Sequence, residues 1–108
     1  MLKQIESILR AIKEEYDAEI NHDFINKEAI SGSSICENLL IALSRIKQIQ
    51  DSDEERVRLF EEYIAKEIAS AKESEMYEPL MSAASYNLSN LEIIHKKLFG
   101  IGQKRINL

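Results

Sequence analysis

The sequence predicts an all-α protein, an antiparallel four-helix bundle with an additional short helix after the first one. Apolar residues recur at steps of three and four along four long segments, which is the spacing of one helix face. Glycine and proline are rare, with three and one in the 108-residue chain. We expect a single domain, 1–108, with main helices at about 2–20, 35–50, 53–73 and 79–99, a short helix at about 24–30 and a tail at 101–108.

The first segment has one apolar seam that Ile8 broadens, formed by Leu2, Ile5, Leu9, Ile12 and Tyr16. The connection that follows, 21–34, is too long for a simple helix hairpin, and it contains the predicted short helix. Asp23 is a candidate cap at the start of that helix, and Gly32 follows its end. Phe24 and Ile25 are expected to plug one end of the core, and the connection is also a candidate contact loop.

Ser34 and Glu37 have the spacing of a capping box, which places the start of the second main helix at residue 35. The apolar seam of this helix is broad, so we expect it to be the most buried of the four. Cys36 falls in its first turn. No base stands next to Cys36 in the sequence, which favours a buried or half-buried thiol over a reactive one.

The stretch Asp51–Glu78 is strongly acidic, with ten acidic and four basic residues. Ser52 and Glu55 repeat the capping-box spacing, and the acids that follow Ser52 suit a helix N-terminus. A ladder of alternating charge at four-residue steps, typical of a solvated face, is formed by Glu54, Arg58, Glu62 and Lys66. Five acids have no opposite charge four residues away and leave an acidic docking face as the alternative: Glu55, Glu61, Glu73, Glu75 and Glu78.

Pro79 suits the first turn of the last helix, and Gly100 is its natural end. The formal charge of −5 disfavours a nucleic-acid-binding surface, which needs clustered lysine and arginine. The single cysteine and the absence of a signal-peptide pattern indicate a soluble, cytoplasmic protein. The longest aliphatic run, 39–43, is far shorter than the roughly 20 residues of a membrane span.

Two Glu-x-x-His pairs, Glu19 with His22 and Glu92 with His95, have the spacing of di-iron helical bundles. In an up-down-up-down bundle these pairs lie at opposite poles, so no shared metal site is expected. Histidine phosphotransfer domains have lysine and glycine three and four residues after their histidine, where this chain has Leu98 and Phe99. We therefore predict no catalytic residue, no metal and no cofactor.

In size, helical content and acidity the chain resembles the small all-helical immunity proteins of bacteria. This resemblance implies a non-catalytic cytoplasmic protein that binds a toxin in a one-to-one complex and neutralises it. The basic cleft of a nuclease toxin would suit the acidic helix. The residues expected to bind the toxin are Glu54, Glu55, Glu61 and Glu62, with Tyr63, Tyr77 and Phe24.

Two alternatives remain open at this stage. The chain can be a structural or regulatory helical module that forms a homodimer through its apolar faces. It can also be a phage-type inhibitor, or a metal-binding or phosphotransfer four-helix protein. Neither the acidity nor the helical pattern separates these classes of protein.

Overall fold

The computed structural model describes residues 1–77 and 82–100, and the side chains of 77 and 82–85 are outside the description. The helices are α1 (Leu2–His22), α2 (Lys27–Lys47), α3 (Asp53–Tyr77) and α4 (Ser82–His95), followed by a π-helical turn, η1 (Lys96–Gly100). No strand occurs in the described ranges. The predicted all-α class is therefore confirmed.

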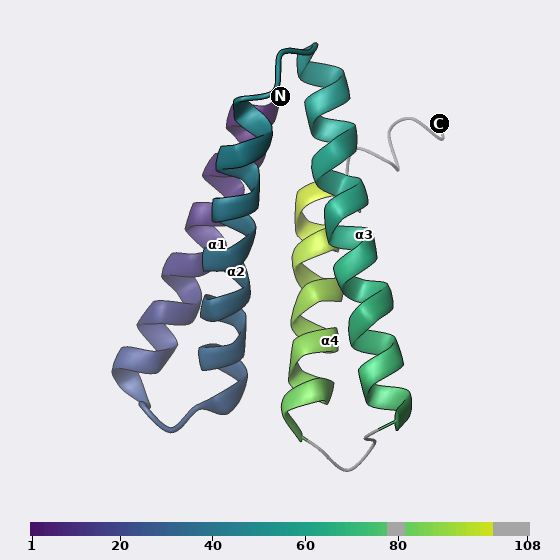
Figure 1. Cartoon of the computed structure of the whole chain (residues 1–108). Coiled ribbons are helices and arrows are strands. Elements are labelled where there is room, and N and C mark those ends of the chain that lie inside the picture. Colours follow the sequence, from purple (N-terminus) through teal and green to yellow (C-terminus); the bar gives the residue numbers. More distant parts are fainter. Residues whose placement is uncertain (78–81, 101–108) are drawn as a thin grey trace.

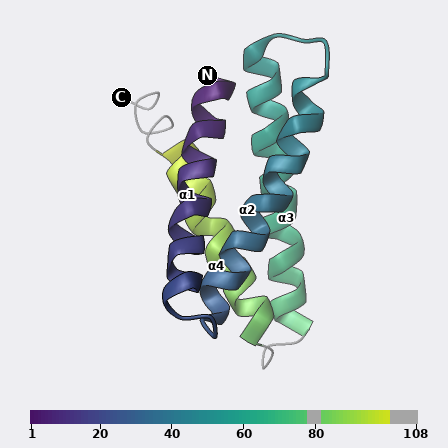
Figure 2. The same cartoon turned by 90° about the vertical axis from the view of Figure 1, so that its left-hand side faces the viewer.

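Successive helices run in opposite directions along the molecule, and α4 is the shortest of the four (Figure 1). In Figure 1, α1 descends, α2 returns, α3 descends and α4 rises toward the starting end. α2 packs more extensively against α1 and α4 than against α3, and α3 packs mainly against α4. In the view turned by a quarter (Figure 2), α1 and α3 lie toward opposite sides of the molecule, and their starting ends meet where Met1 and Leu2 contact Asp53.

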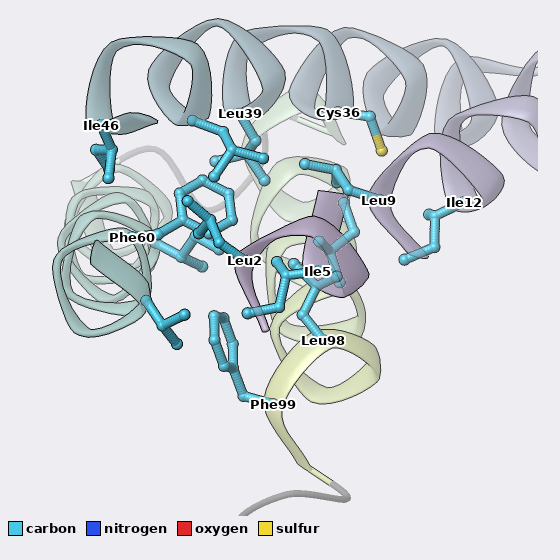
Figure 3. Packing of buried hydrophobic residues seen from close by; sticks show 14 residues of the cluster. Leu2, Ile5, Leu9, Ile12, Cys36, Leu39, Ile46, Phe60, Leu98 and Phe99 are labelled. Carbon is cyan, nitrogen blue, oxygen red and sulfur yellow. The ribbon is translucent and has the colours of Figure 1, made fainter. Parts of the chain in front are cut away.

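The core lies between the four helices and is formed by aliphatic side chains together with Phe60, Phe99 and Cys36. Its largest fully buried apolar side chains are Phe60, Leu9, Leu39, Leu43, Ile64 and Ile94. Residues of α1, α2, α3 and η1 point toward one another there (Figure 3), and the rings of Phe60 and Phe99 are 6.5 Å apart. Each such side chain contributes about 1.5–3 kcal/mol by leaving water. The seams predicted from the sequence supply most of these residues.

The predicted short helix at 24–30 is wrong as a separate element. α2 begins at Lys27, where the side chain of Asn26 accepts the backbone N–H of Ala29 at 3.0 Å, and it continues through Ser34 without a break. Asp23 instead accepts the N–H of Ile25 at 3.2 Å and so stabilises the short turn between the helices.

Gly32 is an interior helix residue and not a helix end. A Cβ at this position would lie well inside van der Waals contact with the Tyr16 ring, so the glycine lets α1 approach α2 closely. Phe24 and Ile25 do not plug the core, because they are 81% and 70% exposed. They lie in the four-residue turn, 23–26, that connects α1 to α2.

Cys36 lies inside α2 and not in its first turn, and its side chain is fully buried. Burial raises the pKa of the thiol to about 11. The prediction of a buried cysteine is confirmed. The predicted start of the last helix at Pro79 and the tail 101–108 lie outside the described residues.

Candidate protein-binding site

The first turn of α3 holds two of the predicted binding residues, Glu54 and Glu55, at one end of the molecule. The hydroxyl of Ser52 accepts the N–H of Glu55 at 3.1 Å, as the capping-box spacing predicts. The carboxylate of Glu55 does not return to Ser52, whose N–H donates to Asp51 at 2.7 Å. The cap is therefore formed by the hydroxyl alone.

The Glu55 carboxylate is bound by Arg58 instead of by the backbone of Ser52. The Arg58 guanidinium donates to Glu55 and also to Glu62, the latter at 2.7 Å. The contact with Arg58 lowers the pKa of Glu55. Glu55 has no opposite charge four residues away, but it pairs with Arg58, because three-residue spacing also places side chains together.

Glu61 also has a partner, on another helix. Nε2 of His95, at the end of α4, lies 3.3 Å from Glu61 Oε2, and both side chains are about one-third exposed. The His95 ring packs at 5.4 Å from the ring of Phe99. Glu61 therefore links α3 to α4, with a partner on another helix that the four-residue spacing along α3 does not reveal.

Glu54 and Glu61 stand beside an apolar groove between α1 and α3 with a volume of about 460 Å³. Its apolar lining comes from the N-terminus, α1, α3 and η1 and consists of Met1, Ile5, Ile8, Val57, Leu98 and Phe99. Its polar lining includes Gln4, Glu54, Arg58 and Glu61. We call this the acidic groove, because two of the predicted binding residues, Glu54 and Glu61, line it beside the exposed side chain of Ile8.

Ile8 is the groove residue that sequence reasoning assigned to the bundle core. Its side chain is 40% exposed, whereas its seam neighbours Ile5 and Leu9 are buried. The sequence feature that could have predicted this exposure is the position of Ile8 beside the apolar seam of α1, outside the three- and four-residue spacing of the seam. A residue at that position lies at the edge of the buried face, where a groove can form.

The other predicted residues do not share this surface. Tyr63 lines a second groove, between α2 and α3, and its pKa is raised by partial burial and by Glu67. Phe24 lies in the turn between α1 and α2, at the opposite end of the molecule from the start of α3 (Figure 1). The side chain of Tyr77 is outside the described residues.

The two Glu-x-x-His pairs lie at opposite ends of the molecule, since α1 and α4 finish at opposite ends (Figure 1). Within residues 1–77 and 82–100, no three histidine, cysteine or acidic side chains gather where they could hold a metal ion. In the same ranges, no helix is long and apolar enough to cross a membrane.

The geometry therefore offers grooves and charged rims for binding a macromolecule. Two grooves lie on different faces of α3, one with Glu54 and Glu61 and the other with Tyr63 and Glu67. Comparison of the chain with protein-family models, with curated proteins and with solved structures gave no match.

Proposed function

We propose that this protein is a non-catalytic cytoplasmic inhibitor that binds a basic toxin, one to one, in the acidic groove. The observation that carries the proposal is the placement of Glu54 and Glu61 beside the exposed apolar side chain of Ile8. In this proposal the four helices act as one antiparallel bundle that holds α1 and α3 at a fixed separation.

The groove suits a partner segment in which an apolar side chain is flanked by lysine or arginine. The apolar side chain would fill the space between Ile8, Val57 and Phe99. The cationic groups would reach the carboxylates of Glu54 and Glu61 at the rim. Apolar burial would supply the affinity, and the charge pairs would supply orientation and specificity.

The net charge of the chain supports the same choice of partner. The formal charge is −5, and the described helix α3 holds eight acidic and four basic residues. Such a field speeds encounter with a positively charged surface and loses its effect as salt rises. A nuclease toxin presents a surface of this kind, because its cleft binds phosphates.

The test compares two charge reversals of equal size. Tagged full-length protein is used to capture its partner from the source cells, and the purified partner is then titrated against Glu54→Lys and Glu92→Lys variants. Both residues are exposed, but Glu54 lines the groove and Glu92 stands on α4 away from it. We expect Glu54→Lys to weaken binding at least about tenfold, with most of the loss in the association rate at low salt.

Glu92→Lys should change affinity by no more than about two- to threefold, which is the contribution of net charge alone. Ile8→Ser tests the apolar part of the groove without altering charge. Equal effects of Glu54→Lys and Glu92→Lys, together with unchanged binding by Ile8→Ser, would show that the partner does not use this groove. Helical circular dichroism of each variant establishes that the fold is intact.

A further inference from the structure

The second groove, between α2 and α3, is larger than the acidic groove and is not explained by the proposed function. It has a volume of about 610 Å³, and its floor is formed by buried Leu39, Ala42, Ile46 and Leu91. Along α2 it continues into a hollow of about 540 Å³ between α2 and α4, because Ile35, Asn38 and Asn87 line both spaces. We call the two together the α2–α3 groove.

Large apolar side chains remain exposed along its walls. Ile30 and Ile41 of α2 are 45% and 50% exposed, and Tyr63 of α3 is 37% exposed. The lining of α2 runs from Lys27 to Ile46, about 28 Å of helix. The groove is therefore long enough for an entire helix to lie along it, with the protruding isoleucines available to fill a matching groove.

The two walls carry opposite charge. α2 contributes Lys27 and Arg45 to the lining and has one more basic than acidic residue. α3 contributes the acidic Glu67 to the lining. A uniformly basic partner would be repelled by the basic wall on α2. A partner that places an acidic wall over α2 and a basic wall over α3 would be attracted to both walls of the groove.

A second copy of this chain presents such a surface. We infer that the α2–α3 groove is the interface of a homodimer whose twofold axis runs along the groove. This symmetry lays α2 of each copy over α3 of the other, so that Arg45 meets the wall that carries the partner's Glu67. Ile41 of each copy enters the groove of the other beside the partner's Tyr63.

This dimer would leave the acidic groove open. Glu54 and Tyr63 are nine residues apart, which at 100° per residue places them on opposite sides of α3. Each dimer would therefore present two acidic grooves on its outer faces. The inference does not rest on the proposed function, and a foreign partner in the acidic groove is compatible with it.

Sedimentation equilibrium of the full chain from about 1 to about 200 µM tests the inference directly. We expect a monomer–dimer equilibrium for the natural sequence. Ile41→Glu should raise the dissociation constant at least about tenfold, because it places a charge in the apolar contact. Ile93→Glu is the matched control, since Ile93 is 39% exposed on α4 outside the groove, and it should leave the equilibrium unchanged.

Charge exchange provides a second test that does not depend on apolar packing. Arg45→Glu and Glu67→Arg should each weaken the dimer, and the double variant should recover it, because the two walls exchange signs. A monomer at every concentration, or equal weakening by Ile41→Glu and Ile93→Glu, would overturn the inference. The inference would also be overturned if the residues of the α2–α3 groove were protected from solvent only after a foreign protein was added, and not by self-association. Toxin binding by the monomeric Ile41→Glu variant would show that binding in the acidic groove does not require the dimer, so the two proposals can fail independently.

Discussion

Asn90 is the buried polar side chain that fixes how three helices meet. Its Nδ2 donates to the carbonyl oxygen of Glu28 at 2.9 Å and lies 3.3 Å from the Ser31 hydroxyl. Its Oδ1 accepts the Tyr16 hydroxyl at 3.0 Å. Because α1, α2 and α4 each contribute a partner, these hydrogen bonds specify one lateral arrangement of the helices in a core that is otherwise apolar.

Replacing Asn90 with leucine should lower the free energy of unfolding by about 2–3 kcal/mol. The variant removes the Asn90 partner of the Glu28 carbonyl and of the Tyr16 hydroxyl, at a position where the Asn90 side chain is fully buried. Urea unfolding followed by circular dichroism measures the loss. Asn87→Ala is the control one turn away, because Asn87 is exposed and accepts only from Ser31 among the described contacts.

The control should cost less than about 1 kcal/mol, since water can replace a partner at an exposed site. If Asn90→Leu were as stable as the natural protein, the three helices would be held by apolar packing alone. The hydrogen bonds of Asn90 would then contribute specificity without net stability.

The capping-box spacing occurs twice in the sequence, but only one of the two serines lies at a helix start. This difference predicts different effects on stability when each serine is replaced. Ser52 is followed by Glu55 and caps α3, whereas Ser34 is followed by Glu37 and lies exposed within α2. Ser52→Ala should therefore destabilise the protein by about 1 kcal/mol, through loss of the cap. Ser34→Ala should be neutral or slightly stabilising, because alanine favours the helix interior.

Thermal or urea unfolding of the two variants checks this pair, and each serves as the control for the other. A comparable loss in Ser34→Ala would mean that α2 has an end at residue 34 in solution. That result would restore the short separate helix at 24–30 that the sequence predicted.

The helices that the sequence predicted well are those with an unbroken apolar period. The seam of α1 and the cap of α3 needed only local information, namely the spacing of Leu2, Ile5 and Leu9 and the hydroxyl of Ser52. The start of α2 could not be obtained this way. Gly32 and Ser34 have the local signals of a break, and what keeps them helical is the packing of Gly32 against Tyr16, a contact between residues of different helices.

The candidate site was predictable to a similar extent. The acids of α3 were found, and the Glu55–Arg58 pair was within reach of a three-residue spacing rule. The separation of Glu54 from Tyr63 also follows from helix geometry, without a structure. The contact of Glu61 with His95 required the packing of α3 against α4, and the grooves required the positions of all four helices.

At the scale of the whole molecule, the helical frame keeps two titratable groups neutral. Burial raises the pKa of Tyr16 from an ordinary value of 10.0 to about 12. Burial also raises the pKa of Cys36 from 9.0 to about 11. Tyr16 belongs to α1 and Cys36 to α2, so the titration of the two groups depends on the packing of α1 against α2. The Tyr16 hydroxyl also donates to Asn90, which connects α1 to α4.

These shifts predict the alkaline limit of the fold. The unfolded chain releases the Cys36 proton near pH 9 and the Tyr16 proton near pH 10, whereas the folded chain holds them to about 11 and about 12. A raised pKa in the folded state contributes stability that is complete below the unfolded value and is lost as pH rises through the folded value. The urea midpoint should therefore decline from about pH 9 to about pH 12, and Tyr16→Phe should decline less steeply above about pH 10. A parallel decline of the natural protein and Tyr16→Phe would assign the alkaline loss to other groups.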